Sequence, residues 1–197
     1  MRPGEAAQAF AVRIATDLDR TTLPVQGPPG AGKTYVGAQM ILALVKAGKK
    51  VGVTANSHKV IHNLLDEVLR QAGTEVPALR GRVAAKVGDD HEDEDDDGII
   101  SLKGNEAPLA ALTGHELDVL GGTSWLWSRE EYANTVDVLF VDEAGQMSLA
   151  NVVAITDPLQ LQVTWLHRLH TCAFSLGILL AWWLQTFPRA ADALRTV

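Results

Sequence analysis

The stretch Gly27 to Thr34, GPPGAGKT, decides the fold of this chain of 197 residues. It follows a short, mainly apolar run and precedes apolar residues at helical spacing, namely Val36, Met40, Ile41, Leu44 and Val45. This is the pattern Gly-x-x-x-x-Gly-Lys-Thr in the strand, loop and helix context that it requires. Its glycines let consecutive backbone N–H groups turn toward an anion, and the first helical turn adds its positive dipole end. The stretch therefore predicts a loop that holds phosphate groups.

A nucleotide triphosphate with its magnesium ion is the ligand that this pattern favours, so we expect ATP and Mg²⁺. Lys33 would reach the β and γ phosphates as a point charge, and the hydroxyl of Thr34 would ligate Mg²⁺. A glycine-rich turn with a chance lysine is the alternative, and the fully matched context disfavours it. The nucleotide-binding residues expected in the loop are Gly27, Pro28, Pro29, Gly30, Ala31, Gly32, Lys33 and Thr34.

Two adjacent carboxylates follow a second apolar strand, expected over 136–141. Asp142 at the end of this strand is placed to hold the Mg²⁺ shell, and Glu143 is placed to take a proton from an attacking water. The Asp alone would suffice for binding, whereas the following Glu indicates hydrolysis. Two surface acids after a strand are the alternative, which the phosphate loop upstream makes less favourable.

Strand and helix signals alternate along much of the chain. We expect helices over 5–19, from the phosphate loop to about Gly48, and over 58–72, the last capped by Asn56 or Ser57. Strands are expected over 50–54 and 117–120, besides those at 23–26 and 136–141. This alternation predicts an α/β fold of the P-loop NTPase type, a parallel sheet with helices on both faces.

The pattern weakens between Thr74 and Glu116, which we interpret as an irregular insertion containing a mobile acidic loop. Eight acidic residues lie within 89–97 and account for the net charge of −7, since the other acids and bases nearly balance. Composition therefore neither demands nor forbids a nucleic-acid partner. The acidic run resembles the start of a calcium-binding loop, but Gly104 stands where a bidentate Glu is needed, so a solvated charge run is preferred.

Composition also bears on the compartment and on metals. One cysteine, Cys172, excludes an internal disulfide framework and, with no secretion signal expected, suits the cytoplasm. The longest apolar run, 172–184, has thirteen residues, fewer than the roughly 18 that span a bilayer, so no membrane partner is expected. The histidine pair at 58 and 62 has no third ligand nearby, and the cluster of His167, His170 and Cys172 has no fourth, so neither favours a metal site.

Taken together, GPPGAGKT, the pentapeptide DEAGQ (142–146) and VGVTANSHKVIHNLL (51–65) resemble the first RecA-like domain of superfamily 1 helicases. The branch includes the nonsense-mediated-decay helicase and the helicase part of RecB-like nuclease–helicase fusions, and the similarity covers residues 5–154. The resemblance implies an ATP-hydrolysing motor that binds single-stranded DNA or RNA. Gln8 would read adenine, and Gln146 would join the catalytic residues Lys33 and Glu143. The strand-contacting residues implied are Thr54, Asn56, Ser57, His58 and Thr123. Trp125 and Trp127 are equally consistent with base stacking and with the core.

The sequence departs from this family after DEAGQ. The family has a helix and then a strand ending in Gly-Asp-x-x-Gln-Leu, which lies between the phosphate-loop strand and the DEAGQ strand. Asp157 to Gln160 resembles this γ-phosphate sensor, but it follows Glu143 too closely for a helix and a strand, so chance remains an equal alternative. We expect either 152–155 or 173–184 to fill the resulting gap in the sheet. The expected domain is 1–161, with the insertion at 74–116, followed by a divergent apolar tail, 162–197.

A second RecA-like domain, or a nuclease, would have to be supplied elsewhere. That domain carries arginines that complete the family's ATP site, and an arginine finger can be worth roughly 10³ to 10⁵ in rate. The isolated chain is therefore expected to turn over slowly. The competing hypothesis is a non-hydrolysing nucleotide-binding or interaction module, a remnant of such a helicase. A small-molecule phosphotransferase or an ABC-type ATPase is disfavoured because no arginine lid or LSGGQ-like signature is seen.

Overall fold

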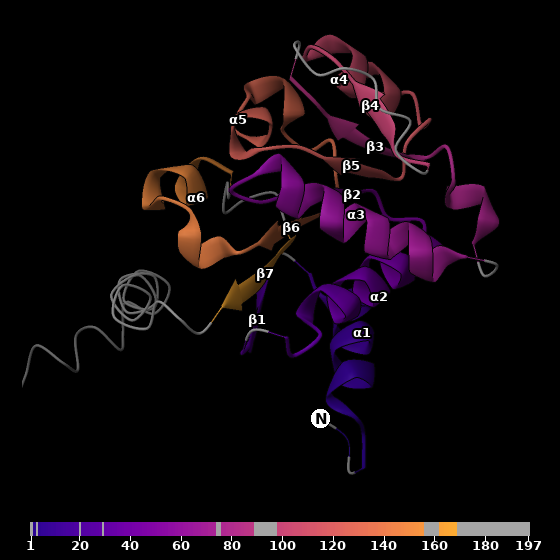
Figure 1. Ribbon diagram of the computed structural model, residues 1–197, viewed down its shortest axis with the longest axis vertical. Coiled ribbons are helices and arrows are strands. Elements are labelled where there is room, and N and C mark those ends of the chain that lie inside the picture. The colour runs from indigo at the N-terminus through magenta and orange to yellow at the C-terminus, as the bar shows by residue number, and fades with distance from the viewer. Residues whose placement is uncertain are drawn as a thin grey trace, which may run out of the picture.

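The protein is described here by a computed structural model that contains a seven-stranded sheet (Figure 1). Residues 2, 4–19, 21–28, 30–73, 76–88 and 98–155 are described in full, and residues 162–168 by their backbone alone. In spatial order the strands are β1 (Thr22–Gly27), β7 (Gln162–Arg168), β6 (Val138–Asp142), β2 (Val51–Thr54), β5 (Val119–Gly121), β3 (Val83–Lys86) and β4 (Ile100–Leu102). Every neighbouring pair is parallel, which confirms the expected α/β sheet.

Helices cover both faces of this sheet. One face packs against α1 (Ala7–Asp17), α2 (Lys33–Lys46) and α3 (His58–Ala72), and the other against α4 (Glu106–Thr113), α5 (Ser124–Trp127) and α6 (Leu149–Ile155). Short 3₁₀ turns lie at η1 (Pro77–Leu79), η2 (Glu130–Tyr132) and η3 (Ala144–Gln146). Because successive side chains of a strand point to opposite faces, both hydrophobic cores draw on the same buried strands.

The helix ends follow from local chemistry. The side chain of Ser57 caps α3 by accepting a hydrogen bond from the backbone N–H of Val60 at 3.4 Å, so Ser57 rather than Asn56 is the cap. Gly73 follows the last residue of α3, and both ends of this helix agree with the sequence prediction. None of the described helices is both long and apolar enough to cross a membrane.

The interpretation of 74–116 as irregular is wrong, because β3, β4 and α4 all lie within it. These two strands have only four and three residues, and β3 contains the small residues Ala84 and Ala85. Short strands of small residues between charged segments give little periodic signal, yet residues 83–85 are fully buried by the neighbouring strand and helices. The acidic run 89–97, with the resemblance to a calcium loop, lies outside the described residues.

The gap between the phosphate-loop strand and the DEAGQ strand is filled by β7. The first segment expected there, 152–155, is instead part of α6, and the other, 173–184, lies outside the described residues. The strand comes instead from the first seven residues of the predicted tail, which pair with β1 on one side and with β6 on the other. The polar residues Gln162, Thr164, His167 and Arg168 interrupt its apolar pattern, so the sequence did not indicate a central strand.

Candidate functional site: a phosphate loop beside an acidic strand end

The phosphate loop connects β1 to α2 at the carboxyl edge of the sheet. β1 ends at Gly27, and α2 begins at Lys33. Gly30 and Gly32 have φ angles of 75° and 77°, in the left-handed region that strains other residues. No atom of the described residues lies within 4 Å of the Cβ that a larger residue would place at either glycine. Pro29 lies outside the described residues.

Lys33 folds back over this loop. Its Nζ donates hydrogen bonds to the carbonyl oxygens of Gly27 at 2.7 Å and Pro28 at 2.8 Å. The ammonium group is thus held close to the loop by acceptors that phosphate oxygens can replace. Thr34 follows on the first turn of α2, and both side chains are half-buried. This donor set, with the positive end of a helix beside it, fits a phosphate chain.

Asp142 ends β6 on the face that α2 covers. Val138 and Phe140 pack with α2 and α3, whereas Leu139 and Val141 belong to the opposite core, so alternation places Asp142 on the side of Phe140. Asp142 is 9% exposed, and its Oδ1 accepts a hydrogen bond from the backbone N–H of Glu143 at 2.8 Å. A buried carboxylate at this point, together with the hydroxyl of Thr34, is a donor pair that suits Mg²⁺.

Glu143 adopts a left-handed backbone conformation, with φ 53° and ψ 36°. Such a conformation costs a non-glycine residue roughly 1 to 3 kcal/mol, and it occurs preferentially at functional sites. The carbonyl oxygen of Glu143 accepts a hydrogen bond from the backbone N–H of Gln146 at 2.8 Å, which closes the η3 turn. The half-buried Glu143 and the exposed Gln146 are thus fixed in one tight turn directly after the strand.

Register shows how near the two halves of the site lie. Arg168 of β7 is level with Gly27 of β1, and Leu166 is level with Asp142 of β6. Strands β1 and β6 are therefore separated by one strand, about 10 Å at the usual strand spacing, and they end at the same edge. The sequence does not predict this placement of the β7 backbone, because 162–168 falls within the expected tail.

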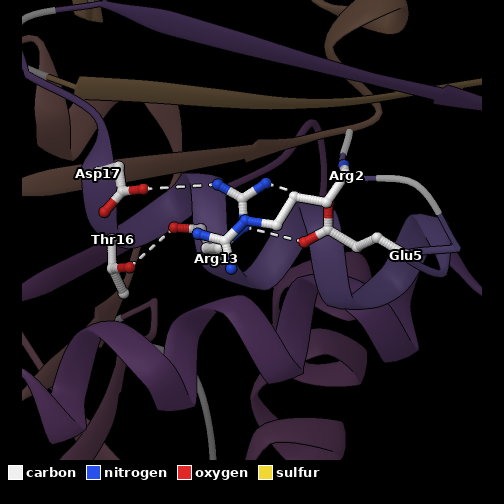
Figure 2. Close-up of polar contacts among 5 residues, drawn as sticks. All are labelled: Arg2, Glu5, Arg13, Thr16 and Asp17. Atoms are coloured by element: carbon white, nitrogen blue, oxygen red, sulfur yellow. Dashed lines mark hydrogen bonds and ion pairs between the residues drawn. The ribbon is translucent and has the colours of Figure 1, made fainter.

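A cluster of charged groups links the segment before α1 to this helix (Figure 2). Gln8, on the first turn of α1, is exposed. Arg13 donates from Nε and Nη2 to both carboxylate oxygens of Glu5, at 2.9 and 3.1 Å, and its Nη1 lies 3.8 Å from Asp17. The backbone N–H of Arg2 also donates to Glu5 at 2.8 Å. The hydrogen bonds from Arg13, and next that from Arg2, lower the pKa of Glu5 to about 2. The assignment of Gln8 to adenine stays a prediction.

The residues expected to contact a nucleic-acid strand differ in their exposure to solvent. Asn56, Ser57 and His58 are exposed just beyond the carboxyl end of β2, and Thr123 is half-buried beyond the end of the neighbouring β5. Thr54 is fully buried, and its hydroxyl has no hydrogen-bond partner among the described residues. Because Thr54 lies on the face packed against α5 and α6, its side chain cannot contact a nucleic-acid strand in this conformation.

The two tryptophans near β5 have different environments. Trp127 is a core residue, whose Nε1 donates to the carbonyl oxygens of Val53 at 3.2 Å and Gly122 at 3.1 Å. Trp125 is 79% exposed. The possible sensor, 157–160, and the metal candidates His170 and Cys172 lie outside the described residues. In the part of the chain that is described, no three His, Cys, Asp or Glu side chains come together as a metal site.

The parallel sheet with its phosphate loop and acidic strand end defines a P-loop NTPase-like fold. The chain belongs to the AAA domain family, whose sequence profile matches residues 4–164. No curated protein sequence matches the chain closely enough to count as a relative.

Similar solved structures include three helicases. The UvsW helicase from bacteriophage T4 matches with a TM-score of 0.55 and 14% identity, over 83% of this chain and 52% of that one. RecG bound to a three-way DNA junction matches with a TM-score of 0.54 and 16% identity, over 82% of this chain and 20% of that one. An arterivirus nonstructural protein 10 helicase in complex with DNA matches with a TM-score of 0.47 and 19% identity, over 81% of this chain and 30% of that one. At these identities the first two show a helicase-like fold alone, and this chain spans about half the length of the UvsW structure.

Proposed function

We propose that this chain is the ATP-binding and ATP-hydrolysing motor domain of a superfamily 1 DNA or RNA helicase of the DEAGQ branch. The observation that carries the proposal is the shared edge of β1 and β6. There the phosphate loop and Asp142 stand one strand apart, with Asp142 on the face that α2 covers. Membership of the AAA domain family and a helicase-like fold support the same conclusion.

The nucleotide is held by the loop from Gly27 to Thr34, with Gln8 as the candidate contact to adenine. Phosphate oxygens replace the carbonyl acceptors that now engage Lys33. Thr34 and Asp142 hold Mg²⁺, which when bound neutralises charge on the phosphates. The loop amides and Lys33 thus orient the triphosphate along the edge of the sheet.

Hydrolysis then requires an oriented water on the far side of the γ phosphate. The water oxygen forms a bond to the γ phosphorus, the bond from that phosphorus to the bridging oxygen breaks, and ADP leaves with that bond's electron pair. Glu143 accepts a proton from the attacking water, so the products are ADP and inorganic phosphate. The tight turn at Glu143 fixes the backbone of this residue directly after the strand end that supplies Asp142.

Contact with a nucleic-acid strand is assigned to the loops that follow β2 and β5. Their small polar residues Asn56, Ser57 and Thr123, with His58, suit contacts to the sugar–phosphate backbone of single-stranded DNA or RNA. Gln146, exposed after the turn at Glu143, would link these loops to the nucleotide. A second RecA-like domain supplied elsewhere would complete the ATP site and raise the rate.

The test compares nucleotide binding with phosphate release in the full chain. Glu143→Gln should keep its affinity for MgATP and lose at least about 100-fold in phosphate release, the usual contribution of a general base. Lys33→Ala should lose nucleotide affinity. Glu116→Gln is the matched control, because Glu116 precedes β5 at the opposite edge of the sheet and should change neither quantity.

Single-stranded oligonucleotides should raise the wild-type rate. An unchanged rate, even with a second RecA-like domain added, would remove the helicase assignment. Nucleotide affinity with no phosphate release under any of these conditions would instead identify a non-hydrolysing nucleotide-binding module. Equal rates of phosphate release by wild type and Glu143→Gln would show that Glu143 is not the general base.

A further inference from the structure

The most exposed large apolar side chain in the described part of the chain is Trp125, at 79%. Single exposed apolar residues are common on protein surfaces, so exposure alone indicates nothing. Trp125 differs in two respects that can be read from its surroundings. The turn that carries it is fixed to the core, and that turn lies beside the loops assigned to a nucleic-acid strand.

The helix α5 is a single turn that Trp127 anchors. The indole N–H of Trp127 is shared between the carbonyl oxygens of Val53 and Gly122, and its ring packs edge-to-face on Tyr132 with centroids 5.9 Å apart. Only a glycine fits at position 52, because a Cβ there would lie 2.8 Å from the Trp127 ring. This anchoring stops the turn from rotating, so Trp125 stays on the solvent side.

The anchor also joins the two predicted strand-binding loops. The backbone N–H of Gly122 donates to the carbonyl oxygen of Val53 at 2.9 Å, which ties the end of β5 to the end of β2. Ser57 follows on one side of this junction, and Thr123 leads into α5 on the other. Trp125 therefore comes two residues after a loop at the carboxyl edge, where open α/β sheets place their ligands.

We propose that Trp125 is a stacking platform for one nucleobase of a single strand bound along this edge, an inference that rests on the function proposed above. The small polar side chains of the two loops suit the sugar–phosphate backbone, but they offer no flat apolar surface to a base. The exposed indole supplies that surface, and any of the bases can use it. Bases inside a duplex are already stacked on each other, so the platform selects single strands.

An apolar protein partner is the other candidate occupant. Leu149 and Val153 are also exposed, at 54% and 63%, on α6, which packs beside α5. The residues that immediately precede Trp125 and flank the neighbouring loop are polar, however, and this favours a nucleic acid. Val153 supplies a control for the loss of an exposed apolar side chain on this surface.

The experiment measures binding of a fluorescent 15-nucleotide single strand to the full chain by anisotropy, with and without MgATP. Trp125→Ala should weaken binding about 5- to 150-fold, which corresponds to the ~1 to 3 kcal/mol that stacking contributes per base. Trp125→Phe should recover most of this loss. Val153→Ala, a change of an exposed apolar residue on the adjacent helix, should leave the affinity unchanged, and Trp125→Ala should keep the wild-type melting temperature and MgATP affinity.

An abasic strand of the same length separates stacking from other causes. Wild type and Trp125→Ala should bind it equally, because it offers no base. The inference is overturned if Trp125→Ala binds the ordinary strand as wild type does, or if it loses the same factor with the abasic strand. Loss of affinity for an added second RecA-like domain, with strand binding unchanged, would also overturn it and indicate a protein partner. A wild-type chain that binds MgATP but no strand refutes the inference and the helicase assignment together, whereas strand-stimulated hydrolysis indifferent to Trp125 refutes the inference alone.

Discussion

Replacing Gly52 with alanine should destabilise the fold, because β2 passes too close to two core side chains to admit a methyl group. A Cβ at Gly52 would lie 2.8 Å from Cδ1 of Leu139 and 2.8 and 2.9 Å from Cη2 and Cζ2 of Trp127. Contacts of this length force a shift. Trp127 resists the shift because its Nε1 is hydrogen-bonded to two backbone carbonyls, and Leu139 is fully buried.

The expected cost is about 1 to 3 kcal/mol, the usual range for one extra methyl group in a packed core. Gly88→Ala is the matched control, because in the part of the chain that the structure describes no atom lies within 4 Å of a Cβ at Gly88, and its φ is not in the left-handed region. Both substitutions reduce the entropy of the unfolded chain by a similar amount, about 0.4 to 1 kcal/mol in favour of the variant. The difference between the two variants therefore isolates the overlap at Gly52.

Urea unfolding followed by far-UV circular dichroism gives both free energies, and a melting curve should show a decrease of about 2 to 4 °C for each kcal/mol lost. Gly52→Ala should unfold at lower urea than Gly88→Ala, with the same dependence on urea concentration. Equal midpoints for the two variants would show that the Trp127 side chain is not held as tightly as its contacts imply. The anchoring of α5 would then lose its physical basis.

Three further outcomes are expected. The pKa of Glu5 should be about 2, so the stability contributed by its cluster is present above pH 4.5 and is lost as the pH falls toward 2. Carboxyl chemical shifts measure this pKa, and Arg13→Ala should raise it toward 4.5, since the largest cause of the shift is removed while the hydrogen bond from Arg2 remains. Burial raises the pKa of Tyr132 to about 12, so the free energy of unfolding should fall as the pH rises from 10 toward 12. Tyr132→Phe should not show this alkaline loss, although it also loses the 2.7 Å hydrogen bond to the carbonyl oxygen of Asn105. Arg82→Ala removes a bidentate ion pair with Asp118, at 2.6 and 2.8 Å, and should lower the free energy of unfolding in urea by about 1 kcal/mol. Arg129→Ala removes a more exposed ion pair with Glu131 and should lower it by less. A measured pKa near 4.5 for Glu5 would contradict the first expectation. A loss of stability at alkaline pH in Tyr132→Phe as well would contradict the second, and equal decreases in the free energy of unfolding for the two arginine variants would contradict the third.

Local patterns predicted the elements around the phosphate loop well. The stripe of apolar residues in α3 fixed its length, and the Ser57 cap and Gly73 marked its two ends. The phosphate loop was evident because its glycines and Lys33 meet a fixed spacing between a strand and a helix. The strand before Asp142 was evident for a similar reason, since a run of four apolar residues, 138–141, needs burial on both faces.

Elements whose signal depends on their neighbours were missed. β3 and β4 are short and contain small residues, and they become strands only because adjacent backbone groups complete their hydrogen bonds. β7 carries polar residues among its apolar ones, so nothing in its composition marks it as central. The roles of Trp125 and Trp127 could not be separated either, because both belong to the same tripeptide and only packing tells core from surface.

The sequence by itself determined that this chain has a phosphate loop, an acidic strand end and a parallel α/β architecture. These features depend on residue type and spacing over a few neighbours, which the printed order contains. The tertiary structure alone decided that 162–168 occupies the gap between β1 and β6, that Thr54 is buried, and that Trp125 is exposed on an anchored turn. Those outcomes depend on which distant segments compete for the same space and hydrogen bonds, and only the folded chain settles that competition.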